Sequence, residues 1–211
     1  MRMRKKPNLI PRMERAGAVL ESAPEQLRGR WLESAEHYSK LFVELGCGKG
    51  SFTCRTAAAE PEALLLAVEK VPDAMVVAME RACEAELKNV RFLDVDAVRL
   101  PELLAPEEAD RLYINFCDPW PKKKQFKRRL TAPAFLKLYK EVLKSGGQVH
   151  FKTDNLPLFD WSEEQFLAEG FLLSEVTRDL HANGPVGIMT DYEAKFYGEG
   201  KPICRLVATK V

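Results

Sequence analysis

The chain has 211 residues, which is enough for one compact domain with a buried core and too few for two comfortable ones. Its apolar share of 46% and charged share of 30% are typical of a soluble globular protein, and no apolar stretch is long enough to cross a bilayer. The N-terminus is basic, but no apolar segment follows it. We therefore expect no secretory signal and a cytoplasmic location.

The cysteines and histidines do not form a pattern that predicts a metal site. The five cysteines include no C-x-x-C pair and their number is odd, so neither a zinc site nor a disulfide framework is expected. The three histidines are far apart in the sequence, and we interpret each as a structural residue. Free thiols in a reducing compartment fit this composition better.

The net charge of +1 conceals two basic blocks, one at the N-terminus and one from Lys122 to Arg129. Such blocks on a nearly neutral chain favour a localised contact with a polyanion. The alternative is that both are solvated or disordered segments, and composition alone leaves the two interpretations open. We expect residues 1–15 to form a basic, extended, flexible arm and residues 16–211 to form a single domain.

Apolar runs and helical periodicity alternate along the chain after the arm. The expected strands are 41–45, 63–68, 90–93, 111–116, 148–152, 171–177 and 203–210. The expected helices are 24–40, 51–60, 73–87, 100–104, 133–143 and 162–169. This alternation predicts an α/β fold with a mostly parallel seven-stranded sheet, helices on both faces, and an antiparallel hairpin of the last two strands at one edge.

A glycine cluster follows the first expected strand, where ligands bind in open α/β sheets. A phosphate-binding P-loop is excluded because Val43 occupies its first glycine position and Gly50 follows Lys49 where Ser or Thr is required. A dinucleotide motif is disfavoured because Ser51 occupies its last glycine position. What remains is the pattern acidic-x-Gly-x-Gly-x-Gly, from Glu44 through Gly46, Gly48 and Gly50. It resembles the first motif of Rossmann-like, class I S-adenosylmethionine-dependent methyltransferases.

The next two strands also end in acids. Glu69 follows the second strand, where a carboxylate can accept both ribose hydroxyl hydrogens of a nucleoside. Asp96 follows the third strand and is placed to reach the adenine amino group. The alternative is that Glu69 and Asp96 are surface carboxylates that cap helices. Three successive strands that each end in an acid favour S-adenosylmethionine as the ligand.

The fourth strand runs into Asp118-Pro119-Trp120-Pro121, the position of the fourth motif in such enzymes. The two prolines stiffen the chain and fix the directions of Asp118 and Trp120. An aromatic ring beside a carboxylate suits a nucleobase, which offers a stacking face and hydrogen-bond donors. The alternative is a proline-rich turn with a buried tryptophan.

The segment from Lys122 to Arg129, hereafter the basic tract, carries six cations directly after this turn. Cations beside a reaction site can hold nucleic-acid phosphates. A small-molecule acceptor would not need so many charges, so the basic tract favours RNA.

With these motifs in place, nearly the whole chain resembles the bacterial tRNA (guanine-N7)-methyltransferases. The Asp-Pro-Trp-Pro-Lys-Lys run is the most specific motif, and Gln125 is a departure because members usually carry His there. The residues that carry the resemblance are Glu44–Gly50, residues 118–123 with 127–130, residues 151–155, residues 190–193, and the N-terminal residues 4–7.

The resemblance implies a methyl transfer to N7 of guanosine 46 in the variable loop of tRNA. We expect no metal, and no obligate protein partner is evident from the sequence. It implies that Glu44, Glu69, Asp96 and Asp118 line the cofactor pocket, and we expect Asp118 to be the catalytic residue. The residues expected to contact the target nucleoside are Lys122, Asp154, Thr190, Asp191, Tyr192 and Glu193. Those expected to bind RNA are Lys124, Gln125, Phe126, Lys127, Arg128 and Arg129. Two alternatives are an RNA-binding protein that has lost catalysis and a methyltransferase of small acceptors.

Overall fold

The computed structural model describes residues 6–35 and 37–211, which fall into two compact units, Met1–Leu104 and Ala105–Val211. The N-terminal unit contains three parallel strands in the order β3-β2-β1. They are β1 (Lys40–Leu45), β2 (Ala63–Glu69) and β3 (Val90–Asp94). Every residue of β2 is buried, as expected for a continuous apolar run in the middle of a parallel sheet.

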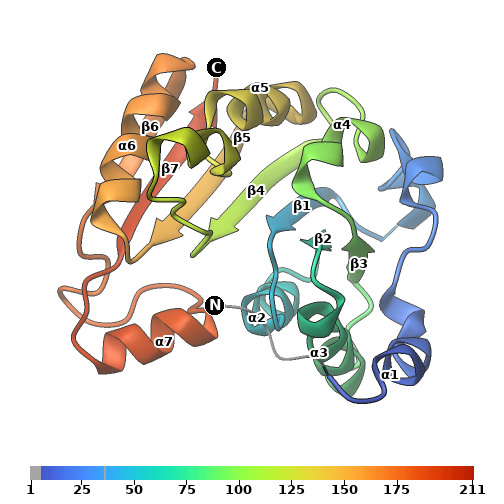
Figure 1. Ribbon diagram of the computed structural model, residues 1–211. Coiled ribbons are helices and arrows are strands. Elements are labelled where there is room, and N and C mark those ends of the chain that lie inside the picture. The colour runs from blue at the N-terminus through green and yellow to red at the C-terminus, as the bar shows by residue number, and fades with distance from the viewer. Residues whose placement is uncertain (1–5, 36) are drawn as a thin grey trace. The chain divides into compact units, whose positions relative to one another are not determined.

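Helices α2 (Ser51–Ala59) and α3 (Pro72–Glu84) connect these strands and lie beside each other below them in Figure 1. The buried face of α3 contains Met75 and Met79, one helical turn apart. The described residues of this unit also form α1 (Leu9–Arg15), α4 (Leu100–Leu103) and four short 3₁₀ helices. The 3₁₀ helices are η1 (Gly17–Val19), η2 (Pro24–Leu27), η3 (Glu33–Ala35) and η4 (Ala97–Arg99).

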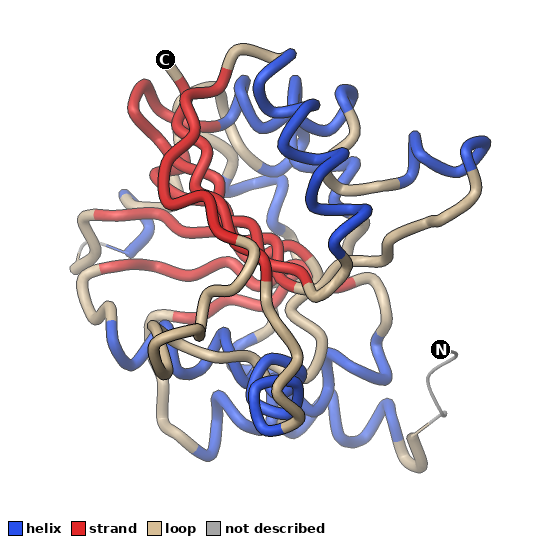
Figure 2. The backbone as a smooth tube through the Cα atoms, turned by 90° about the vertical axis from the view of Figure 1, so that its left-hand side faces the viewer, coloured by secondary structure: helices blue, strands red, loops and turns tan. Residues whose placement is uncertain are grey.

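The C-terminal unit contains four strands in the order β4-β5-β7-β6. β4 (Ala109–Asn115) and β5 (Leu143–Thr153) are parallel, whereas β7 (Cys204–Lys210) runs antiparallel to β5 and to the edge strand β6 (Phe171–Thr177). Its helices are α5 (Pro133–Val142), α6 (Leu156–Ala168), α7 (Asp191–Gly198) and the 3₁₀ helix η5 (Lys123–Arg128). A helix lies in every connection between consecutive strands of each unit (Figure 2).

All seven expected strands are present with boundaries shifted at the ends, and the fold class is confirmed, including the antiparallel pair β6–β7. The largest shift is in β5, which begins at Leu143 and passes through Gly146 with a φ of 75° rather than starting after a turn. Within the described residues, no helix is long and apolar enough to cross a bilayer.

The single helix expected over residues 24–40 is wrong. Gly29 has a φ of 77° and the preceding residue, Arg28, has a ψ of 122°, so the chain turns out of helical conformation there. Trp31 is buried all the same, and its indole N–H donates to the carbonyl of Leu103 at 2.9 Å.

The extended arm expected over residues 1–15 is wrong for residues 9–15, which form α1. Arg12 of this helix binds the carboxylate of Glu80 on α3, and this pair raises the pKa of Arg12 and lowers that of Glu80. The main chain of Lys6 also donates to Asp73 at the start of α3. Residues 1–5 of the expected arm lie outside the described residues.

Candidate functional site

The turn after β1 has the backbone conformation that its glycines predict. Gly46, Gly48 and Gly50 all have positive φ, at 78°, 57° and 74°. A Cβ on Gly50 would lie 2.5 Å from the Cβ of Ala78, so α3 approaches this turn too closely for any side chain. A Cβ on Gly46 or Gly48 would meet no atom within 4 Å. The turn is thus packed against protein at one glycine and open to a ligand at the other two.

The carboxylate of Glu69 is held by this same turn. One oxygen accepts the N–H of Gly48 at 3.0 Å and the other accepts the N–H of Val71 at 2.9 Å. The residue is 9% exposed. Because each carboxylate oxygen can accept more than one hydrogen bond, Glu69 retains acceptor capacity for hydroxyl groups of a ligand. This fits the ribose role expected for it.

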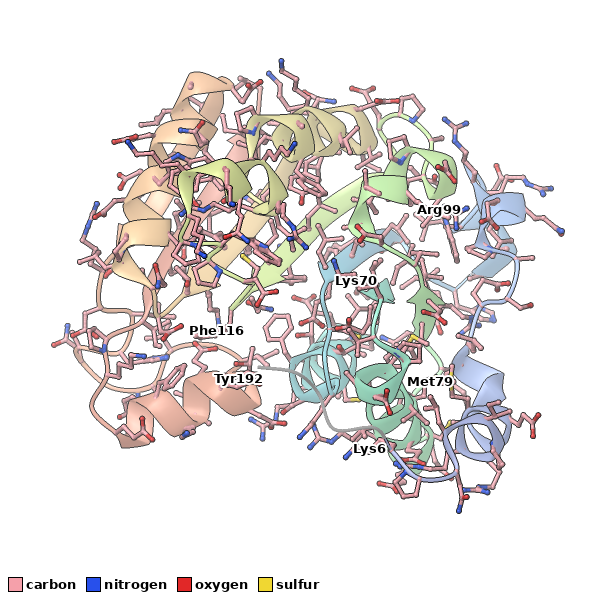
Figure 3. All side chains as sticks on the ribbon, viewed as in Figure 1. Lys6, Lys70, Met79, Arg99, Phe116 and Tyr192 are labelled. Atoms are coloured by element: carbon pink, nitrogen blue, oxygen red, sulfur yellow. The ribbon has the colours of Figure 1, made fainter. Side chains whose placement is uncertain are left out.

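Glu44 and Asp96 lie near the ends of the neighbouring strands. Glu44 is 2% exposed and accepts the hydroxyl of Thr53, which links β1 to the first turn of α2. Asp96 accepts the N–H of Val98 at 3.2 Å and pairs with Lys70 at 3.1 Å (Lys70 is labelled in Figure 3). Partial burial opposes ionisation of Asp96, but these two interactions outweigh it and lower its pKa. Asp96 therefore caps the start of a short helix, as the alternative interpretation expected. Its contact with adenine stays a prediction.

The turn after β4 is strained. Phe116 and Trp120 have φ values of 53° and 40°, which are unfavourable for residues other than glycine. Such outliers persist only where the surroundings enforce them, and they cluster at functional sites. Asp118 lies between them and is exposed. Burial raises the pKa of the Cys117 thiol to about 12, which favours the protonated thiol over the thiolate.

The basic tract folds into η5 and does not present all its members to solvent. The exposed cations are Lys122, Lys123, Lys124, Lys127 and Arg128, and the guanidinium of Arg128 lies 3.7 Å from the centroid of the Trp120 ring. Gln125 and Phe126 are half-buried. Arg129 is only 4% exposed, so the expectation that it belongs to an RNA-facing surface needs correction. Its neighbours in space, Phe126 and Trp161, withdraw it from solvent.

The segment from Thr190 to Glu193 begins α7 through a reciprocal capping box. The Thr190 hydroxyl accepts the N–H of Glu193, and the Glu193 carboxylate accepts the N–H of Thr190. The helix was not expected from the sequence, although the spacing of Thr and Glu is a recognised signal for it. Asp191 and Tyr192 are exposed, and Figure 3 shows Tyr192 at the start of α7.

Glu193 is fully buried, and its carboxylate binds side chains that could not be predicted as its partners from the sequence. The ammonium of Lys152 lies 3.0 Å from both of its carboxylate oxygens, and His181 lies 3.1 Å from one of them. Lys152 also donates to the carbonyl of Ile188 at 2.9 Å. These residues hold the loop before α7. No local pattern signals this pairing, because Lys152 and Glu193 are 41 positions apart in the chain.

Phe116 connects the strained turn to the same part of the unit. Its N–H donates to the carbonyl of Lys152 at 2.9 Å, and its ring lies 6.1 Å from that of Phe196 on α7. Figure 3 shows Phe116 at the end of β4. Asp154 pairs with Lys201, whose ammonium lies 4.2 Å from the Phe196 centroid. The C-terminal unit therefore brings Asp154, Phe116 and the start of α7 into one connected network.

Solved structures of methyltransferases share this fold. The chain resembles the 16S rRNA methyltransferase KamB with a TM-score of 0.65 and 18% identity, covering 90% of this chain and 93% of that one. It also resembles a variant of the 16S rRNA (adenine(1408)-N(1))-methyltransferase from Catenulisporales acidiphilia, solved with cosubstrate SAM, at a TM-score of 0.64 and 17% identity, with coverages of 90% and 92%. The fold is that of class I methyltransferases.

The sequence places the chain more narrowly. A family model described as "Putative methyltransferase" matches residues 38–206. The tRNA (guanine-N(7)-)-methyltransferase of Listeria innocua is 41% identical over 99% of this chain and 98% of its own length. The enzyme of the same name from Bacillus subtilis is 40% identical, with coverages of 97% for both chains. The chain belongs to the tRNA (guanine-N(7)-)-methyltransferase family.

Proposed function

We propose that this protein methylates N7 of a guanine in tRNA, with S-adenosylmethionine as the methyl donor and guanosine 46 of the variable loop as the target. The observation that carries the proposal is the glycine turn after β1, whose Gly48 N–H binds the Glu69 carboxylate at 3.0 Å. The full-length similarity to the family supports the choice of reaction. A tRNA substrate implies a cytoplasmic location.

S-Adenosylmethionine supplies an electrophilic methyl group on a sulfonium centre. In the proposal, Glu69 accepts hydrogen bonds from the ribose hydroxyls and Asp96 binds the adenine amino group. The open sides of Gly46 and Gly48 let the main chain approach the ligand. Glu44 anchors the first turn of α2 through Thr53. Each of these residues of the N-terminal unit thus has a separate task.

The acceptor atom determines what the protein must do at the reaction site. Guanine N7 has an in-plane lone pair and no proton, so no general base is required at that atom. Alignment of the reactants then becomes the main contribution. The base gains positive charge, which a fixed carboxylate stabilises. We assign this charge-stabilising role to Asp118, because its side chain is exposed and it lies between the two strained residues Phe116 and Trp120.

The exposed cations of the basic tract hold phosphates, whereas Asp154, Thr190, Asp191 and Tyr192 contact the target nucleoside or its flanks. Lys122 lies at the junction of the tract and the Asp118 turn. Glu193 has a different task in this proposal, because its buried carboxylate binds Lys152 and His181. It keeps Thr190 and Asp191 in place without touching the RNA.

The decisive experiment is methyl transfer from labelled S-adenosylmethionine to unmodified tRNA, followed by nucleoside analysis. We expect 7-methylguanosine in a tRNA that carries guanosine 46 and none in a matched transcript with adenosine at that position. Label at another guanine would contradict the position but not the reaction. Binding of tRNA without transfer would favour an RNA-binding protein, and transfer to free nucleosides alone would favour a small-acceptor enzyme.

A further inference from the structure

Arg129 differs from the other five cations of the basic tract. Those five are exposed, whereas Arg129 is 4% exposed. Its guanidinium lies 3.6 Å from the centroid of the Phe126 ring and 4.4 Å from that of Trp161. A guanidinium on an aromatic face is bound most strongly when it is shielded from water, as here. Because Trp161 belongs to α6, this contact fixes Arg129 to the helical layer of the unit.

The hydrogen-bond donors of Arg129 point toward the Asp118 turn. Nε donates to the carbonyl of Pro119 at 2.8 Å, and a longer bond of 3.4 Å joins Nη2 to the carbonyl of Trp120. Both acceptors follow Asp118 directly in the chain. Trp120 has the unfavourable φ of 40°, which must be enforced by contacts. Arg129 provides such contacts on one side, and Arg128 covers the face of the Trp120 ring.

We propose that Arg129 is a positioning residue that holds the turn and thereby fixes the direction in which Asp118 is presented. Its effect on methyl transfer rests on the proposed function, but its effect on the conformation of the turn does not. The Nη1 atom is buried without a hydrogen-bond partner, and burial lowers the pKa of Arg129. Burying a charged group with an unpaired N–H reduces the free energy of unfolding. Arg129 therefore fits a residue that fixes the geometry of the turn rather than one that stabilises the fold.

Lysine cannot take over this task. Its ammonium is a compact, strongly hydrated charge, whereas arginine presents a planar fork that stacks on rings while donating in the plane. Arg129→Lys therefore keeps the positive charge but removes the planar group that stacks on the rings and donates to the turn. Lys124→Ala is the complementary change, because it removes an exposed cation of the same tract that, unlike Arg128, does not cover the Trp120 ring. Lys137→Ala on α5 is an exposed control outside the basic tract.

The test combines four measurements on the full chain: single-turnover methylation at saturating tRNA and S-adenosylmethionine, the salt dependence of tRNA binding, the affinity for S-adenosylmethionine, and the rate of tryptic cleavage within residues 122–128. For Arg129→Lys we expect a rate lower by about tenfold or more, because small misplacements are costly in catalysis. We also expect faster cleavage, with the salt slope and cofactor affinity unchanged. For Lys124→Ala we expect the salt slope to fall by about one unit.

A single-turnover rate of Arg129→Lys within twofold of wild type would overturn the proposal. So would an unchanged cleavage rate together with a reduced salt slope, because that is the behaviour of a surface cation. If Arg129→Lys does not fold, Trp161→Leu removes one stacking face and should give the same pattern more weakly. If the wild-type protein transfers no methyl group to tRNA, the proposed function fails, whereas the cleavage assay still decides whether Arg129 holds the turn.

Discussion

The two units bury charge in different ways. The N-terminal unit buries the carboxylates of Glu44 and Glu69 at the ends of adjacent strands, where a hydroxyl and main-chain N–H groups bind them. The C-terminal unit buries two cations, Lys152 and Arg129, beneath the loops that carry the candidate substrate residues, and its buried carboxylate, Glu193, is paired with Lys152. The difference indicates two tasks. The first arrangement leaves carboxylate oxygens available to a ligand, and the second holds loop conformations.

The strongest test of this comparison is to remove a buried cation. Lys152→Met leaves the carboxylate of Glu193 buried without its main partner, which costs about 3–5 kcal/mol. We expect a loss of this size in the free energy of unfolding measured with urea. The double change Lys152→Met with Glu193→Leu should cost clearly less than the sum of the two single changes. Strict additivity would show that the 3.0 Å contact contributes nothing.

The next largest effect concerns chemistry at the strained turn. Asp118→Ala should lower the single-turnover rate by about 10²-fold or more, since the carboxylate stabilises charge that develops on the base. The affinity for tRNA should change much less. The wild-type rate should be nearly flat from about pH 7 to 9, because guanine N7 carries no proton and the reaction needs no general base at that atom.

His150 should not contribute to this pH profile. Burial, followed by the nearby charges of Arg111 and Arg205, lowers the pKa of His150 to about 3, so it is neutral throughout this range. The depressed pKa means that stability is lost as the pH falls below about 6.5, where the unfolded chain binds the proton first. A steep rise in rate between pH 7 and 9, or loss of chemistry in a folded His150→Gln variant, would contradict the mechanism.

A smaller effect tests the N-terminal carboxylates. Glu69→Ala removes charge-assisted hydrogen bonds of roughly 1.5–3 kcal/mol each, so the affinity for S-adenosylmethionine should fall by about tenfold or more. Calorimetric titration measures it directly. The Val71 and Gly48 N–H groups also lose their acceptor, so Glu69→Gln, which keeps an oxygen, is the matched control. Equal affinities for wild type and Glu69→Ala would remove Glu69 from the site.

Local patterns explain what could be predicted from the sequence. The glycine turn, the apolar strands and the acids that follow them depend on neighbouring residues, and the structure contains the turn and the strands where they were expected. Arg128 and Arg129 could not be distinguished in this way. Arg129 is buried because Trp161, on a separate helix, covers it. The capping box of Thr190 and Glu193 was a local signal, but the burial of Glu193 depends on Lys152, a distant residue of β5.

The smallest expected effect is on the salt dependence of tRNA binding. It tests the difference between the exposed cations of the basic tract and the buried Arg129. Lys124, Lys127 and Arg128 are exposed, so each should release counterions when it binds a phosphate. Neutralising all three should flatten the slope of log affinity against log salt by about one unit for each phosphate that is no longer bound. The affinity for S-adenosylmethionine should stay at the wild-type value, because none of the three belongs to the cofactor-binding residues of the N-terminal unit. Arg129→Lys should leave the slope unchanged. If the triple variant keeps the wild-type slope, the exposed cations are a solvated surface, and the residues that bind phosphate must be sought elsewhere on the protein.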